Sequence, residues 1–425
     1  MPAALAPVTA LLLSVALLLM GNGLQGTLLP VRAQLEFFST LDIGVLGSSY
    51  FLGFAAGCYL GPYVVRRAGH IRTFTAMVSL ASAVALAHAL VLDPFVWWFL
   101  RALTGFCFAV LYMVIESWLN EKSTNENRGF VFSIYTIINL TVVTVGQMML
   151  TLGSPTAFPL FAVASILVSL AALPVALTNA PAPAPIATVQ IRVRRLYQSS
   201  PVGFAGALAV GLANGSFWSL APVFAQSNIF IVGTTGIALF MSTAVIAGAA
   251  GQWPLGRLSD KIDRRKVIVI TCAGAALSGI GMSIFSDNWE QAVFVFSFLF
   301  GIFAFPLYSL CAAHMNDAVE TGGFVEASSG LLLLYATGAV FGPLMASATM
   351  RFTGPEGLFL YTSAVHAVMA IFAVYRMRQR ARPPEEAREP FADSIRVAQT
   401  VATLDPLGKS PEGEDSEQAS AAAAS

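Results

Sequence analysis

Charged side chains are scarce in this sequence. Only 11% of its 425 residues are charged, whereas soluble domains carry about 25%, and 56% are hydrophobic. The four cysteines and four histidines lack the spacing of a metal site, so we expect no metal and no other cofactor. The HExxH and GxSxG motifs of hydrolytic enzymes are also missing, which disfavours an enzyme. The scarcity of charged residues indicates a chain that faces lipid more than water.

Long apolar runs occupy most of the chain and are separated by short polar breaks. Each run has about the 20 residues that span a bilayer. Because backbone polar groups in lipid must be satisfied within their own segment, each run predicts a helix. The predicted fold class is an all-α integral membrane protein with twelve transmembrane helices. We expect these helices at 8–31, 43–65, 73–92, 94–118, 130–152, 156–177, 201–224, 233–256, 266–286, 290–312, 326–350 and 356–376.

Basic residues gather in every second loop and in the C-terminal tail, whereas the opposite loops hold only Arg32 and Arg351. Cytoplasmic loops are enriched in lysine and arginine. We therefore expect a multi-pass protein of a bacterial inner membrane with both termini in the cytoplasm. The formal net charge of zero gives no reason to expect a nucleic-acid partner.

One polar phrase occurs twice within the apolar runs. NGLQGTLLPVRAQ, which starts at Asn22, returns 192 residues later as NGSFWSLAPVFAQ, which starts at Asn214, and seven of thirteen positions agree. Tyr112 and Tyr308 correspond in the same way, 196 residues apart. Six helices are thus repeated in the same order and orientation, which predicts two parallel halves with a ligand site between them at the membrane midplane.

This repeat divides the chain into four expected parts. Two pseudo-symmetric six-helix bundles are joined by a proline-rich cytoplasmic linker, and a charged tail, rich in proline and alanine and mostly disordered, follows the second bundle. The expected boundaries are 1–177, 178–200, 201–376 and 377–425.

Several motifs carry a family resemblance. GRLSDKIDRRK (256–266) resembles the loop signature of the major facilitator superfamily, and LRALTG (100–105) resembles a second motif of that family. PLYSLCAAHMND (306–317), followed by ASSGLLLLYATGAVFGP (327–343), is similar to its bacterial YcaD-like branch. The resemblance covers about residues 8–376. It implies alternating access around a cavity lined by the first, fourth, seventh and tenth helices, and it leaves the substrate open.

The repeated phrase also supplies candidate substrate-binding residues. Asn22 and Asn214 lie mid-helix, each before a glycine, and both features are unfavourable within a helix. A ligand-facing wall would explain them, and a hydrogen bond between the halves is the alternative. Arg101 suits an anionic substrate, proton coupling or a buried ion pair. The paired tyrosines Tyr112 and Tyr308 could line the cavity or could equally be packing residues. The candidates are Asn22, Gln25, Arg101, Tyr112, Asn214, Trp218 and Tyr308.

A second set of residues is a candidate for coupling or gating. Asp260 follows the expected eighth helix among basic side chains, where it could pair with cations and face a helix N-terminus of the other half. Such contacts would hold the cytoplasmic side closed, although basic residues there also set topology. Glu116 suits a pair with a loop residue such as Arg72 or Arg128 better than proton transfer. The candidates are Glu116, Arg66, Arg72, Asp260, Arg264 and Arg265.

Three kinds of function compete. A secondary active transporter that moves a small organic solute fits best, with protons open as the coupling ion. A proton-coupled drug or metabolite exporter is the alternative within that class, and a non-transporting sensor or scaffold is the alternative outside it. A membrane enzyme ranks last. We expect a monomer that carries a neutral or anionic solute, because Arg101 is the only deep cation and no deep acid faces it in the central helices.

Overall fold

The computed structural model describes residues 8–123, 128–177, 192–229, 233–286, 289–319, 324–379 and 391. Within these ranges, twelve helical spans are long and apolar enough to cross a membrane. The predicted fold class is confirmed. Most of the predicted linker and tail lies outside the described residues, and the part of the linker that is described contains α9 (Val193–Ser199).

The first six spans consist of eight elements. In chain order they are α2 (Thr9–Leu35), α3 (Thr40–Ala68), α4 (His70–Leu90), α5 (Pro94–Lys122), α6 (Arg128–Met148) with the 3-10 turn η1 (Met149–Leu152), and α7 (Phe158–Leu170) with α8 (Ala172–Ala176). The last six spans are α10 (Pro201–Asn228), α11 (Gly233–Lys261), α12 (Arg264–Phe285), α13 (Glu290–Ala304) with α14 (Leu307–Asn316), α15 (Phe324–Thr353) and α16 (Gly357–Gln379).

Two of the spans are interrupted where the sequence predicts continuous helices. Helix α7 ends at Leu170, four residues before Pro174, and α13 ends shortly before Pro306. A proline ring clashes with the carbonyl four residues earlier and has no N–H to donate. Each proline therefore accounts for the end of one helix and the start of another. Several helices also continue past their predicted ends, and α11 does so by five residues, to Lys261.

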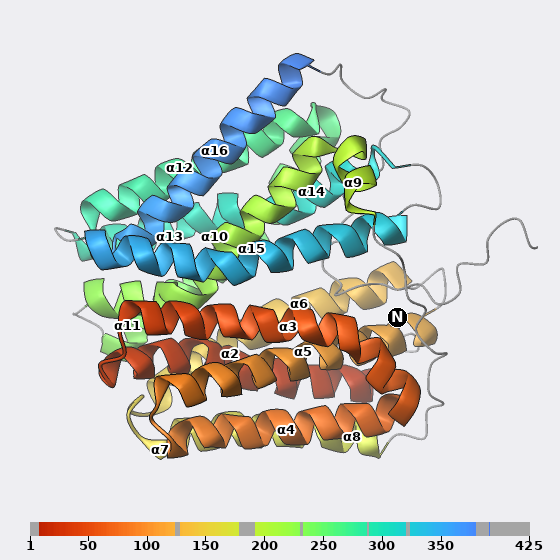
Figure 1. The fold of residues 1–425 in the computed structure, drawn as a ribbon, viewed down its shortest axis with the longest axis vertical. Coiled ribbons are helices and arrows are strands. Elements are labelled where there is room, and N and C mark those ends of the chain that lie inside the picture. Colours follow the sequence, from red (N-terminus) through yellow and green to blue (C-terminus); the bar gives the residue numbers. More distant parts are fainter. Residues whose placement is uncertain are drawn as a thin grey trace, which may run out of the picture.

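The helices form two groups that face each other (Figure 1). Helices α2 to α8 make one group, and α10 to α16 make the other. Across the boundary, α3 contacts α15 and α10, α6 contacts α11, and α2 contacts α10. Each group also has its own internal packing, as in the contacts of α3 with α5 and of α12 with α16.

The two groups are in close contact at the end where α3 begins. A Cβ atom on Gly44 would lie 2.9 Å from the carbonyl oxygen of Pro343, and one on Gly47 would meet the side chain of Ser219. At the same end, Gln34 donates a hydrogen bond of 3.0 Å to Ser227. Residues without side chains let these backbones come together. This is the end predicted to face away from the cytoplasm.

Helix α9 is held to the start of α15 by one acidic side chain. Arg192 donates to Glu326 from Nε at 3.1 Å and from Nη2 at 3.0 Å. These hydrogen bonds raise the pKa of the Arg192 guanidinium. A bidentate pair fixes direction as well as distance, so it sets where the described end of the linker meets the second group.

Candidate functional site

A cavity of about 460 Å³ lies between the two groups of helices. This volume is within the range of small-molecule sites. The resemblance implies a lining from the first, fourth, seventh and tenth spans, and residues of α2, α5, α10 and α14 do line the cavity. Helices α3, α6, α11 and α15 contribute as well. Eight of the twelve spans therefore surround one central space.

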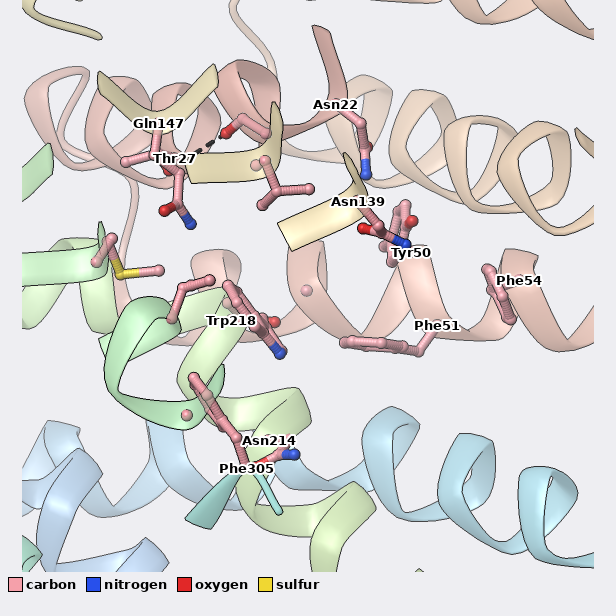
Figure 2. A pocket seen from close by; sticks show the side chains of 18 of the residues that line it. Asn22, Thr27, Tyr50, Phe51, Phe54, Asn139, Gln147, Asn214, Trp218 and Phe305 are labelled. Atoms are coloured by element: carbon pink, nitrogen blue, oxygen red, sulfur yellow. Dashed lines mark hydrogen bonds between the residues drawn. The ribbon is translucent and has the colours of Figure 1, made fainter. Parts of the chain in front are cut away.

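A polar cluster forms the wall supplied by the first group. Asn22 of α2 is hydrogen-bonded to the side chain of Tyr50 on α3. The guanidinium carbon of Arg101, on α5, lies 4.4 Å from the centre of the Tyr50 ring. Figure 2 shows Asn139 of α6 beside the same tyrosine. Arg101 Nη1 is buried and has no hydrogen-bond partner among the residues that the structure describes.

The second group supplies an aromatic wall. Trp218 of α10 stacks on Phe305, with ring centres 5.5 Å apart and planes 11° from parallel. Asn214 lies one turn before Trp218 and beside Phe305 in the view of Figure 2. Its Oδ1 is buried and lacks a hydrogen-bond partner within the described ranges. Two helices are joined nearby, where Gln252 of α11 donates to Ser309 of α14 at 2.9 Å.

A cluster of ion pairs lies at the basic end of the second group. Arg264 pairs with Asp317 at 2.7 Å, and both side chains are almost fully buried. It also pairs with Asp260 at 3.3 Å. Arg265 pairs with Asp263 at 2.7 Å. Burial opposes ionisation of Asp263, but the hydrogen bonds from Arg265 hold the pKa of this carboxyl below its usual value.

Phe391, from beyond α16, also binds at this cluster. Its backbone N–H donates to Asp260 Oδ1 at 2.9 Å. Phe391 is 3% exposed, and its ring covers Gly256, where a Cβ would collide with the ring. The contacts of Asp260 and Arg264 described above thus join parts of the second half to one another and to Phe391 of the tail. The predicted contact of Asp260 with a helix N-terminus of the first half is not among them.

Comparison with known proteins shows which family the chain resembles. A family model described as Major Facilitator Superfamily matches residues 203–411. The uncharacterized MFS-type transporter YcaD of Escherichia coli strain UMN026 is 27% identical over 380 residues, which are 89% of this chain and 97% of that protein. YcaD of Escherichia fergusonii is 26% identical over 385 residues, with the same shares covered. The chain is a multi-pass membrane protein that resembles transporters of the major facilitator superfamily. The predicted YcaD-like resemblance is confirmed.

Solved transporters share the fold of this protein at low sequence identity. The nucleoside transporter NupG matches with a TM-score of 0.75 and 11% identity, covering 88% of this chain and 99% of that chain. A bacterial homolog to the human lysosomal transporter Spinster, in an inward-facing and occupied conformation, matches with a TM-score of 0.69 and 15% identity. That match covers 90% of this chain and 98% of the homolog.

The structure brings most of the predicted substrate-binding residues to one place. Six of the seven line the cavity: Asn22, Arg101, Tyr112, Asn214, Trp218 and Tyr308. Gln25 is buried, with 3% of its surface exposed, but it does not line the cavity. The lining residues of α2 fall at 22, 23, 26, 27 and 30, which is one helical stripe, and position 25 lies beside that stripe.

The predicted coupling or gating residues do not form one cluster. Arg66 and Arg72 are exposed at the ends of α3 and α4. Glu116 is 2% exposed and is hydrogen-bonded to Tyr135 of α6. The side chain of Arg128, an alternative partner predicted for Glu116, lies outside the described residues.

Some lining residues were not predicted, although the repeat contained a signal for part of them. The offset of 196 residues that relates Tyr112 to Tyr308 also relates Asn139 to Tyr335, and both of these line the cavity. Extending the repeat from helix to helix would therefore have found that pair. Phe305 and Gln252 had no comparable signal, because their counterparts, Ala109 and Gly57, carry neither a polar nor an aromatic side chain.

Proposed function

We propose that this protein is a secondary active transporter that moves a small organic solute by alternating access. The two halves, 1–177 and 201–376, would rock around the cavity in a bacterial inner membrane, with both termini in the cytoplasm. The observation that carries the proposal is the pairing of repeat-related residues, such as Asn22 with Asn214 and Tyr112 with Tyr308, in the lining of one cavity. Pseudo-symmetric halves around a midplane site are the arrangement that alternating access uses.

The arrangement of contacts supports this mechanism. The two groups touch through Gly44 and Gly47 at one end of α3, and the cavity extends from this contact along the same helix to Tyr50 and Phe54. A second state would release the first contact and bring the other ends together. Solute binding can favour one state only through contacts that differ between the two states, and a lining drawn from both halves provides them.

The cavity itself offers no carboxylate among the lining residues that the structure describes. Glu116 is a buried carboxylate one turn beyond the lining residue Tyr112 on α5. We include it in the proposal as the coupling residue, although its sequence position favours a pair with a loop residue. If the transport rate did not depend on the proton gradient, the role of Glu116 in coupling would be refuted and the rest of the proposal would stand.

Accessibility from both sides of the membrane tests the transporter proposal. The four native cysteines are replaced, and Ala249→Cys places one thiol in the cavity lining. Membrane-impermeant maleimide is then applied to intact cells and to inverted vesicles. A transporter exposes this position to each side in turn, so both preparations react. A matched Ser154→Cys variant, in an exposed loop, should react from one side only. Reaction of Ala249→Cys from a single side would favour the sensor or scaffold instead.

A further inference from the structure

The two walls of the cavity differ in chemical character. The first group contributes Arg101, the only ionised side chain among the lining residues that are described. The second group contributes the stacked pair Trp218 and Phe305. A solute that touches both walls meets a positive charge on one side and a flat apolar face on the other.

Arg101 lines the cavity, and within the described residues no ion pair neutralises its charge. Its contact with the Tyr50 ring is a cation–π interaction, which stabilises a cation without neutralising it. Arg101 Nη1 is buried and lacks a hydrogen-bond partner within the described part of the chain. A buried donor without a partner is unfavourable, and the penalty is larger for a charged group. An anionic group of a ligand would satisfy this donor and balance the charge, whereas a cationic ligand would be repelled.

The stacked aromatic pair offers a face to a planar ring. The rings of Trp218 and Phe305 are 11° from parallel, and both line the cavity. Phe51 of α3 lies across the cavity from them in Figure 2. Aromatic rings gain from offset stacking beyond the area that they bury. A flat ring between the walls would therefore bind better than a saturated ring of similar size.

Two amide oxygens define a third feature of the site. Asn214 Oδ1 and Gln147 Oε1 are buried and have no hydrogen-bond partner among the residues described. Both residues line the cavity, one from each half. An acceptor in this position requires an N–H or O–H donor. A ligand that carries such a donor would remove the penalty of leaving an oxygen unpaired.

We propose that the substrate is a planar aromatic organic acid with an N–H or O–H donor on its ring. Its anionic group binds Arg101, and its ring lies against Trp218. This inference rests on the proposed function, because it takes the central cavity as the transport site. A ligand of this kind bridges the two halves, so its affinity depends on their separation. That dependence couples binding to the change of state.

Matched ligand pairs test the inference on the full-length protein in detergent. Indole-3-carboxylate and its carboxamide differ in charge, and benzoate and cyclohexanecarboxylate differ in the ring. We expect indole-3-carboxylate to bind about 10- to 100-fold more tightly than its amide, the range for a hydrogen bond to a charged group. We also expect benzoate to bind more tightly than cyclohexanecarboxylate. Equal affinities within both pairs would overturn the inference.

Variants test the preference for the acid and the preference for the aromatic ring separately. Arg101→Gln should abolish the preference for the acid over the amide. Trp218→Leu should reduce the preference for the aromatic ring and leave the preference for the acid. Trp253→Leu is the matched control, because Trp253 is 66% exposed and does not line the cavity. If Arg101→Gln does not fold, Trp218→Leu still tests the inference through the ring preference. A ring preference that Trp218→Leu leaves unchanged would contradict the inference.

A third measurement distinguishes this inference from the proposed function. Saturating indole-3-carboxylate should slow maleimide labelling of Ala249→Cys, because the ligand occupies the cavity. Labelling from both sides that the acid does not slow would refute the substrate class and leave alternating access intact. Labelling from one side only would refute alternating access whatever the acid does.

Discussion

Replacing Gly47 by alanine should shift the protein towards the state that is open at the end where α3 begins. In the described state, a Cβ at this position would collide with Ser219 and lie 3.3 Å from Pro343 Cβ. Ser219 cannot move without loss, because its hydroxyl donates to Gly215 at 2.8 Å. Overpacking of this kind costs about 1–3 kcal/mol. Once the halves separate at this end, the methyl group no longer meets the second group, so the cost falls on the closed state.

A cost of that size changes the ratio of the two states by about 5- to 150-fold. The helix-forming advantage of alanine over glycine is about 1 kcal/mol, but it applies to both states and cancels. We therefore expect faster labelling of Ala249→Cys from the non-cytoplasmic side and slower labelling from the cytoplasmic side. The rates are measured with impermeant maleimide on intact cells and on inverted vesicles.

Gly26→Ala serves as the control for this experiment. A Cβ on Gly26 would meet nothing within 4 Å, although Gly26 lines the same cavity. This variant should label at the parental rates from both sides. If Gly47→Ala left the labelling rates unchanged, or if Gly26→Ala changed them equally, steric closure at Gly47 would be the wrong explanation.

Three further variants probe other parts of the structure. Asp317→Asn removes a buried partner of Arg264, and because breaking a buried pair costs about 3–5 kcal/mol, the melting temperature in detergent should fall by several degrees. An unchanged melting temperature would show that the remaining contacts of Arg264 suffice. Phe391→Ala uncovers Gly256, and burying a phenylalanine contributes about 1.5–3 kcal/mol. Limited proteolysis near residue 391 should therefore become at least 10-fold faster. An equal rate would argue that the Phe391 ring does not hold this segment against α11. Gly26→Trp fills open space, so it should abolish binding of indole-3-carboxylate while the melting temperature stays near that of the parent; retained binding would place the ligand elsewhere.

The twelve spans were predictable because lipid forces the backbone into helices and makes hydropathy decisive. Their internal breaks were not, because proline alone is ambiguous. Pro174 and Pro306 lie at the two interruptions, yet five described helices contain a proline and continue through it. Whether a helix breaks depends on whether neighbouring groups satisfy the freed carbonyl, and this is a property of tertiary packing. The ends of α5 and α11 were missed because hydropathy falls where a helix leaves the hydrocarbon, although the helix continues.

The cavity was more predictable than the ion-pair cluster. The repeat and the cost of a mid-helix amide led to Asn22 and Asn214 without any contact being known. No such signal connects Arg264 to Asp317, which lies 53 residues later, or Asp260 to Phe391. Several carboxylates and several cations occur near this end of the bundle, and a single sequence does not show which of them meet.

The repeat also shows which residues supply the framework and which supply chemical character. Asn22 and Asn214 are identical across the two halves, and so are Tyr112 and Tyr308. Arg101 and Trp218 have no identical counterpart in the other half. The position equivalent to Arg101 is Ser297, whose hydroxyl is satisfied by the carbonyl of Phe240 at 3.1 Å. The position equivalent to Trp218 is Gly26, which faces open space. Symmetric residues can serve both states equally, because each half exchanges its role with the other. Residues that occur in just one half make the cavity asymmetric, with a cation on one wall and an aromatic face on the other. A solute held between them therefore has one preferred orientation, and the specificity of this transporter is to be sought in the positions where its two halves have diverged.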